Sequence, residues 1–226
     1  MATPLFTRNT KLADLIATNH NLILMMPRFG IPLGFGNKTV GEICDTYDVP
    51  ADFLLLVCNA YTFDNFLPDP EQLKQTDMSM LVPYLQASHR FYLADRLPHI
   101  GLHLHHIAEK VDPKYGKILT AFYADYQREV QDHFLCEEKE VFPILESIIG
   151  GGKPQSDESI GLFAESHGNI VDKLTDLTQI VYMYLPGNVL PEETIELIFD
   201  ILQLSNDLEK HALIEEKILM PLILQQ

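Results

Sequence analysis

The chain has 226 residues, of which 46% are hydrophobic, enough to bury the core of one large domain or of a medium domain with a small one attached. It carries 32 acidic and 16 basic residues, a formal net charge of -16, and no run of five or more Lys and Arg residues. We therefore expect neither a nucleic acid held through its phosphates nor an anionic membrane surface as a partner.

The beginning of the chain and its cysteines suggest a compartment. MATPLFTRNTKLADLI has no charged segment followed by an apolar one, so no secretory signal is expected. The longest apolar runs, LILMM and FLLLV, are too short to span a bilayer. Cys44, Cys58 and Cys136 are odd in number and have no C-x-x-C spacing, which fits a reducing compartment. We expect a cytoplasmic protein.

The first part of the chain differs from the rest in its short helical patterns. Residues 1–70 hold such patterns, interrupted by PRFGIPLGFGNK, and they end in FLPDPEQ, which is rich in Pro and Asp. We expect a small helical domain over residues 1–70, a linker over 71–77 and a second domain over 78–226.

Two helices of the small domain are predicted from local signals. Thr39 followed by Glu42 is typical of a capping box, and it predicts a helix that continues to about Tyr47. After the turn Asp-Val-Pro, a second helix is predicted over residues 51–64. The pair has the outline of a helix–turn–helix, but the second helix, ADFLLLVCNAYTFDNF, has no basic residue, which argues against DNA binding.

The second domain is predicted to be an all-α, antiparallel up-down-up-down four-helix bundle. Gly-, Pro- and Asp-rich breaks, VDPK, IIGGGKPQSD and YLPGNVLP, separate long helical patterns. Short connections between long helices predict antiparallel neighbours. The predicted spans are 78–110, 114–148, 157–185 and 191–225. Pro98, Pro143 and Pro221 fall inside them and are expected to kink or shorten the helices.

The bundle sequence contains an internal repeat. HFLCEEKEVFPIL, which begins at His133, aligns with HALIEEKILMPLI, which begins at His211, and both read H-x-x-x-E-E-K-x-x-x-P. A step of 44 residues back from each histidine leads to His89 and to His167. The bundle therefore consists of two helix pairs, each with one lone histidine and one H-x-x-x-E motif.

Helix geometry brings these side chains to a similar level. A spacing of four residues is about one turn, so the histidine and glutamate of each motif project from one face. The two lone histidines lie about ten residues from the start of their helices, and the motif histidines lie about fifteen from the end of theirs. In an antiparallel bundle all four histidines then lie at a similar depth, toward one end.

Four imidazoles and two carboxylates inside an apolar bundle point to bound metal. Buried carboxylates need a counter-charge. Two ions, each bound by two imidazoles and bridged by the two carboxylates, fit this inventory and leave positions for an oxo, hydroxo or external ligand. Imidazole and carboxylate suit iron, and also zinc, copper or nickel. The alternative hypotheses are motifs that are merely solvated and a bundle with buried histidines and no metal.

Three residues near the predicted ligands are expected to support the site. Glu129 lies one turn before His133, and Asp207 lies one turn before His211, so either acid could orient an imidazole or relay protons. The alternative for both is a solvated or salt-bridged acid. Tyr126 continues the same face, as a core aromatic or as a redox-active neighbour.

Other polar residues of the bundle are assigned to its surface or to packing. Glu138 and Glu216 follow the predicted ligands directly, are rotated by about 100°, and are expected to be surface charges. Cys136 is expected to pack. The segment PHIGLHLHHI holds a stripe of histidines, at His99, His103 and His106, without a carboxylate in register on their own helix; a surface cluster is favoured over a metal site.

The repeated motif resembles a known family. The pattern H…H-x-x-x-E…H…H-x-x-x-E, with E-E-x-x-x-x-P after the second and fourth histidines, is similar to that of the hemerythrin-like HHE cation-binding domain. The resemblance implies two iron ions with an oxo or hydroxo bridge, and Glu137 and Glu215 as bridging carboxylates. It also places Glu129 at an acidic position near the iron. The implied ligands are His89, His133, Glu137, His167, His211 and Glu215.

The rest of the chain resembles one subgroup of that family. HRFYLADRLPHI, and the stretch from TKLADL to VPADFLL, are similar to the repair-of-iron-centres proteins, di-iron proteins linked to mending iron–sulfur clusters after nitrosative and oxidative stress. Where that subgroup has adjacent cysteines before a Gly-rich turn, this chain reads LGFG. The small domain is therefore expected to serve docking or homodimerisation rather than thiol chemistry.

The resemblance favours a protein that holds and supplies iron over a turnover enzyme, and no residue is assigned as catalytic. Its partners would be iron–sulfur proteins, bound transiently. One alternative is a protein that binds or senses O2 or NO at an open iron position. A second alternative is a di-iron reductase of NO or peroxide, in which Glu129 and Asp207 relay protons.

Overall fold

A computed structural model describes residues 5–152, 159–184 and 190–224; in the helix after residue 158 it describes the side chains of residues 170 and 172–183 only. Helices make up nearly all of the regular structure, and the described residues contain no strand, only an isolated bridge between Lys11 and Thr39. The predicted all-α fold is confirmed. Within the described part of the chain, no helix has the length and apolar composition needed to cross a bilayer.

The chain divides into two compact units that do not coincide with the predicted domains. The first unit comprises residues 1–88, 144–155 and 210–226. The second comprises residues 89–143 and 156–209. The predicted boundaries at 1–70, 71–77 and 78–226 stay a prediction.

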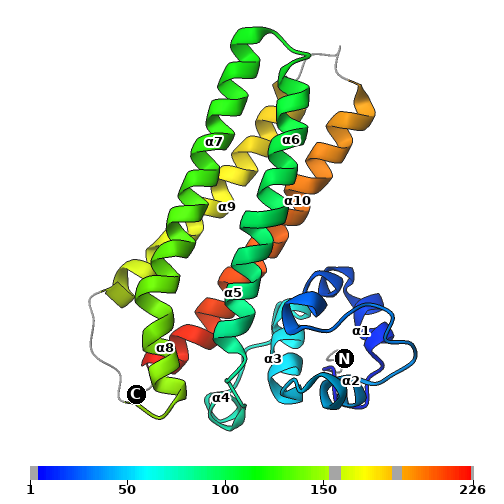
Figure 1. Ribbon diagram of the computed structural model, residues 1–226, viewed down its shortest axis with the longest axis vertical. Coiled ribbons are helices and arrows are strands. Elements are labelled where there is room, and N and C mark those ends of the chain that lie inside the picture. The colour runs from blue at the N-terminus through cyan, green and yellow to red at the C-terminus, as the bar shows by residue number, and fades with distance from the viewer. Residues whose placement is uncertain (1–4, 153–158, 185–189, 225–226) are drawn as a thin grey trace. The chain divides into compact units, whose positions relative to one another are not determined.

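Short helices make up the N-terminal part of the first unit (Figure 1). They are α1 (Leu12–Thr18), the 3-10 turns η1 (His20–Leu24) and η2 (Met26–Phe29), α2 (Val40–Tyr47), α3 (Ala51–Thr62) and α4 (Pro70–Gln75). The capping box is confirmed, since the Thr39 hydroxyl accepts from the Glu42 amide while the Glu42 carboxylate accepts from the Thr39 amide. The helix that it opens ends at Tyr47, as predicted.

An aromatic cluster joins these short helices to α5 (Leu81–Phe91) within the first unit. The rings of Phe29 and Tyr84 stack with centroids 4.7 Å apart, and Phe53 meets Tyr84 edge-on at 6.4 Å. Arg28 is buried beside them, and its guanidinium lies 3.5 Å from the Ser88 hydroxyl. The start of α5 therefore belongs to the core of the small helical region.

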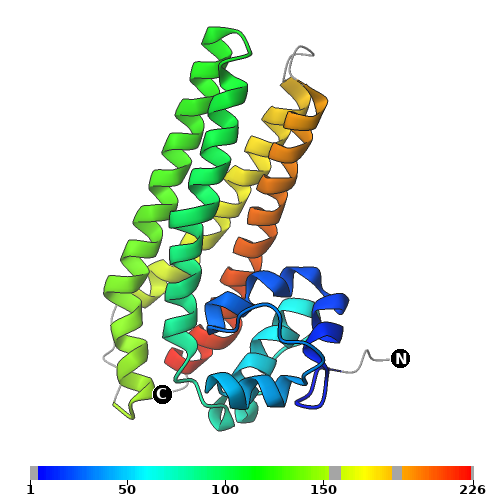
Figure 2. The same ribbon diagram turned by 45° about the vertical axis from the view of Figure 1, so that its right-hand side comes forward.

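The second unit is a bundle of long helices. Among the described residues these are α6 (Leu97–Ala108), α7 (Pro113–Cys136), α9 (Ser159–Tyr184) and α10 (Pro191–Ile214), of which residues 210–214 belong to the first unit. Both views show α6 beside α7 and α9 beside α10 (Figure 1 and Figure 2). Each predicted span covers one or more consecutive helical elements; 78–110, for example, covers α5 to α6. The first and last residues of these combined segments differ from the predicted ones by three residues or fewer.

Contacts within the second unit establish antiparallel neighbours. The Tyr123 hydroxyl of α7 donates to the carbonyl of Leu97, the first residue of α6, at 2.8 Å. The Tyr115 hydroxyl, near the start of α7, donates to the carbonyl of Ile180, near the end of α9, at 3.2 Å. Arg96, just before α6, binds the carboxylate of Asp200 on α10 at 3.1 Å. These pairs agree with the predicted up-down-up-down order.

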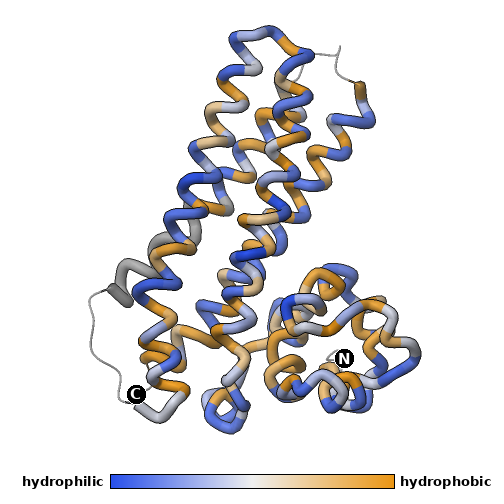
Figure 3. The backbone as a smooth tube through the Cα atoms, in the orientation of Figure 1, coloured by the Kyte–Doolittle hydropathy of each residue, from blue (hydrophilic) through white to orange (hydrophobic). Residues whose placement is uncertain are grey.

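Apolar side chains along one face of each helix fill the middle of the second unit. Hydrophilic and hydrophobic residues are interspersed along the helices (Figure 3), as expected for helices with one buried face. Ile100, Leu119, Leu177 and Leu204 are each 2% exposed or less. This burial of apolar area stabilises the bundle by about 25 cal/mol per Å².

Three prolines are accommodated by wide turns rather than by breaks. The π turns η3 (Tyr92–Arg96), η4 (Glu137–Val141) and η5 (Glu215–Leu219) lead without interruption into α6, α8 (Phe142–Ile149) and α11 (Met220–Leu224). In each case the amide of the residue before the proline bonds to a carbonyl five residues earlier. The helices therefore continue through each proline, because the extra residue of a π turn moves the carbonyls that a proline ring would otherwise meet.

An ion pair near the end of α6 predicts a pH effect on stability. The Lys110 ammonium lies 2.5 Å and 2.6 Å from the two carboxylate oxygens of Glu193 on α10. This hydrogen bond lowers the pKa of Glu193 from its usual 4.5. A carboxyl group with a lowered folded pKa stabilises the fold above its unfolded pKa, and this contribution is lost as the pH falls through the folded value.

We therefore expect Glu193→Gln to lower the urea midpoint of unfolding slightly at pH 7. The difference in midpoint between this variant and the wild type is expected to shrink below pH 4.5. The effect is small because the pair is partly exposed to solvent. Glu192→Gln, an equal change of charge at the exposed neighbouring position, is the control. An equal shift in both variants would contradict a specific role for the pair.

Candidate metal centre

The first H-x-x-x-E motif lies where α7 passes into η4. His133 is in the last turn of α7, and Glu137 is the first residue of the π turn. Nε2 of His133 lies 2.7 Å from Oε1 of Glu137, so the two side chains project from one face, as predicted. Glu137 is 1% exposed, and its carboxylate is therefore removed from bulk water.

His89, on α5, approaches the same carboxylate from the neighbouring helix. Its Nε2 lies 3.1 Å from Oε2 of Glu137, and its side chain is 1% exposed. The two imidazoles thus each lie against one oxygen of the same buried carboxylate. The structure brings together the three residues that the sequence assigned to one helix pair, namely His89, His133 and Glu137.

Aromatic rings fix the His89 imidazole. The Phe134 ring stacks on it with centroids 4.0 Å apart and an interplanar angle of 11°. Phe142, on α8, lies on it at 5.4 Å and 20°. These rings exclude water from the imidazole faces, so electrostatic interactions of its nitrogens are strengthened by the low local dielectric.

Glu138 contacts one of the predicted ligands, a contact that the sequence interpretation did not include. Its Oε1 lies 3.0 Å from Nδ1 of His89, while Nε2 of that ring faces Glu137. A carboxylate on the far nitrogen fixes the tautomer and orientation of a metal-binding histidine. Glu138 is exposed, as predicted, with 39% of its side chain accessible, but its contact with His89 was not predicted. The repeated E-E pair, of which Glu138 is the second residue, is the feature of the sequence that could have indicated this contact.

The equivalent position in the second motif behaves differently. The Glu216 carboxylate is paired with the ammonium of its neighbour, Lys217, at 2.5 Å, and is 68% exposed. Its predicted role as a surface charge agrees with this exposure. The two copies of the repeat are therefore alike in their motif residues and different at the next glutamate.

The second H-x-x-x-E motif repeats the local geometry of the first. His211 is in the last turn of α10, and Glu215 is the first residue of η5. Nε2 of His211 lies 3.2 Å from Oε1 of Glu215, and the two residues are 2% and 0% exposed. In both copies the motif glutamate opens a π turn, a rare element that recurs at functional sites.

Two further predicted residues, His167 and Asp207, belong to the same helix pair as His211. His167 lies within α9, but its side chain is outside the described residues. Asp207 lies one turn before His211 on α10 and is 2% exposed. Its backbone carbonyl accepts a hydrogen bond from the Tyr92 hydroxyl at 3.3 Å. This bond ties α10 to η3, the π turn that follows His89.

The donor set of both motifs fits a hard or borderline cation such as iron. Each motif offers an imidazole nitrogen and a carboxylate oxygen from the same helix face. Both glutamates are almost fully buried, and an ionised carboxylate in such a place is stabilised when a cation or hydrogen-bond donors face it. Histidine with carboxylate is a set used by iron, zinc, copper and nickel.

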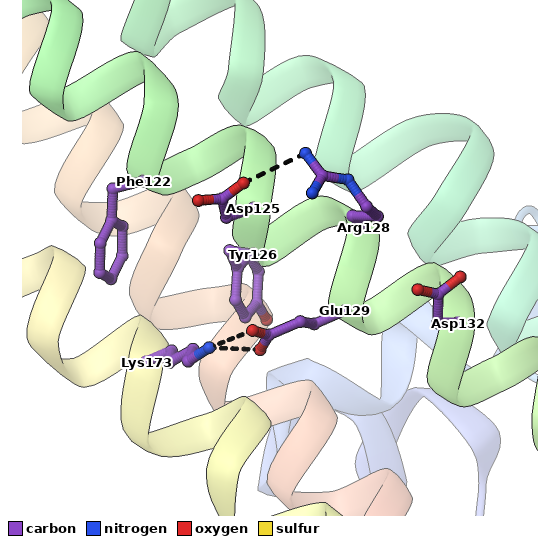
Figure 4. A pocket seen from close by; sticks show the side chains of 7 residues that line it. All are labelled: Phe122, Asp125, Tyr126, Arg128, Glu129, Asp132 and Lys173. Carbon is purple, nitrogen blue, oxygen red and sulfur yellow. Dashed lines mark hydrogen bonds and ion pairs between the residues drawn. The ribbon is translucent and has the colours of Figure 1, made fainter.

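Glu129 lines a pocket of about 460 Å³ between α7 and α9 (Figure 4). Both oxygens of its carboxylate bind the ammonium of Lys173 on α9. Tyr126 and Phe122 form the apolar side of this pocket. The contact with Lys173 could not be found from the sequence, because it joins residues of two separate helices.

Tyr126 is a core aromatic residue. It is 1% exposed, and its ring lies 6.1 Å from that of Tyr123. Burial raises its pKa well above the usual value of 10, so the phenol stays protonated at neutral pH. These surroundings agree with the packing role that was one of the two interpretations of this residue.

Comparison with known proteins adds one finding. Residues 85–223 match the family described as hemerythrin HHE cation binding domain. The matched region contains all six predicted ligands and more than half of the chain. A search among curated proteins gave no match.

Proposed function

This chain belongs to the hemerythrin HHE cation-binding family, and on that premise we propose that its two H-x-x-x-E motifs serve one di-iron centre. His89 and His133 would bind one ion, and His167 and His211 the other. Glu137 and Glu215 would bridge them. The equal placement of the two motifs, each on a helix end that opens a π turn, supports equal roles.

The protein's own residues would control how firmly the ions are held. Glu138 orients His89 through Nδ1, and the rings of Phe134 and Phe142 keep water from that imidazole. The Glu138 carboxylate is 39% exposed and would connect this ligand to the surrounding solvent. Iron bound here would supply an exchangeable cation and a redox couple.

We propose that the protein supplies iron to iron–sulfur clusters damaged by oxidative or nitrosative stress, in the cytoplasm. The observation that carries this proposal is the small helical region before residue 85, where the family match begins. That region resembles the companion domain of repair-of-iron-centres proteins. Transient binding of iron–sulfur proteins would place their clusters close to the iron source.

The cysteines of the small region do not provide thiol chemistry in this proposal. Cys44 and Cys58 are 2% and 0% exposed. Burial raises the pKa of Cys44 to about 11, and it raises the pKa of Cys58 as well. Since the thiolate is the reactive form, both are inert at neutral pH. The small region would act in docking or homodimerisation.

Reactivation of a damaged enzyme tests this function. Iron-loaded protein is expected to restore activity to a dehydratase whose iron–sulfur cluster has lost iron, under anaerobic conditions. His133→Ala, which removes a predicted ligand, is expected to abolish this restoration, and His105→Ala, an exposed histidine, is expected to leave it intact.

Two results would contradict iron supply. One is restoration by iron salts but not by the iron-loaded protein. The other is a reversible visible band on adding O2 or NO to the reduced protein, without restoration of the dehydratase. The second result would support the alternative of gas binding or sensing. Steady-state consumption of NO or peroxide would support a reductase, with Glu129 in the pocket beside α7 as the proton relay.

A further inference from the structure

Two histidines on α6 and one aspartate on α10 form a second cluster of metal-binding groups within the second unit. His99 and His103 are one helical turn apart, with ring centroids separated by 4.4 Å. Asp200 faces them from the neighbouring helix. Nε2 of His99 and Nδ1 of His103 each lie 3.2 Å from the same oxygen, Oδ2 of Asp200.

These separations fit ligands of one tetrahedral ion. Imidazole nitrogens and carboxylate oxygens bind zinc at about 2.1 Å, so two ligands of a tetrahedral zinc are about 3.4 Å apart. The two nitrogen–oxygen separations of 3.2 Å are close to this value. A cation would need only small side-chain shifts to contact all three atoms.

The carboxylate is oriented by groups on its other side. Arg96 binds Oδ1 of Asp200 at 3.1 Å and the Gln203 side-chain oxygen at 2.7 Å. Oδ1 is therefore engaged by the guanidinium, and Oδ2 is directed at the histidines. A partner of this kind orients a metal-binding carboxylate, although its positive charge also weakens the attraction of a cation.

The cluster is accessible and separate from the family's motif. The side chains of His99, His103 and Asp200 are 44%, 34% and 20% exposed, so an ion can enter and a water can complete its coordination. His99 is ten residues beyond His89 along a continuous helical segment, or about 15 Å. One ion cannot be bound at both places.

We propose that His99, His103 and Asp200 bind one divalent cation of the zinc class, independently of the iron centre. The ion would join α6 to α10 near the middle of the bundle. Nitrogen-rich ligands favour zinc, copper, nickel or cobalt over magnesium or calcium. The sequence interpretation found no carboxylate in register on the histidines' own helix; the fold supplies it from α10.

Zinc stoichiometry of the full chain tests the proposal. The protein is titrated with zinc chloride in competition with a chromogenic chelator, as wild type and as His99→Gln/His103→Gln. We expect the double variant to bind one zinc equivalent fewer than the wild type. His105→Gln/His106→Gln, which removes as many histidines from the same helix, is expected to bind as the wild type does.

Two further measurements separate this site from folding and from the iron centre. The variant His133→Ala/His211→Ala is expected to keep the zinc equivalent that His99→Gln/His103→Gln loses, whether or not the proposed iron centre exists. Zinc is expected to raise the melting temperature of His133→Ala/His211→Ala, and to raise it less when Asp200→Asn, which preserves side-chain shape, is added to that variant. An unchanged zinc count in His99→Gln/His103→Gln, or equal losses in the His105 and His106 control, would overturn the proposal.

Discussion

His133→Ala and His211→Ala are each expected to lose most of the iron that the wild-type protein retains after anaerobic purification. The wild type is expected to hold about two iron ions per chain, one for each helix pair. Each substitution removes an imidazole beside a buried glutamate, at 2.7 Å in one motif and 3.2 Å in the other. Because the glutamates would bridge both ions, loss of either histidine should weaken both.

The measurement is the metal content per folded chain, with helicity checked by circular dichroism. His105→Ala is the matched control, because the His105 side chain is 68% exposed and pairs with Glu109, the residue that follows α6. Wild-type protein that contains no iron would refute the di-iron centre. Full iron content in either variant would remove the corresponding histidine from the ligand set.

Gly116→Ala is expected to destabilise the bundle by about 2 kcal/mol or more, although alanine is the better helix former. Gly116 is buried in the first turn of α7. A Cβ at this position would lie 2.4 Å from the carbonyl oxygen of Ala108, the last residue of α6. The atom in its way belongs to the backbone, so the α6–α7 connection would have to open.

The free energy of unfolding in urea measures this effect. Lys117→Ala changes the next, exposed residue of the same turn and is expected to alter stability by less than about 0.5 kcal/mol. The gain in helix propensity from glycine to alanine is about 1 kcal/mol, smaller than the expected cost of the clash. A Gly116→Ala protein as stable as the wild type would show that the connection can move at little cost.

Local features of the fold could be predicted from the sequence because neighbouring residues determine them. The capping box at Thr39 begins α2 as predicted, and Asp112 caps α7 at the VDPK break. The spacing of four residues places His133 beside Glu137 and His211 beside Glu215, since one helical turn fixes both positions.

The π turns could not be predicted from the same rules. Pro143 and Pro221 are clear in the sequence, and a proline inside a helix is expected to distort it. Whether the distortion is a break, a kink or a π turn depends on how the helix is held by its neighbours on both sides of the proline. Here Glu137, Val141 and Phe142, which precede Pro143, are buried, and the helix continues through the π turn.

By itself the sequence determined which residues share a helix face: each H-x-x-x-E pair, the stripe of His99 and His103, and the amphipathic pattern that makes an all-α bundle. Only the tertiary structure decided which groups meet across helices. It placed Glu138 on His89, Lys173 on Glu129, and Asp200 between His99 and His103. The rise and rotation of a helix are set locally, whereas contacts between helices depend on their packing and on the reach of each side chain.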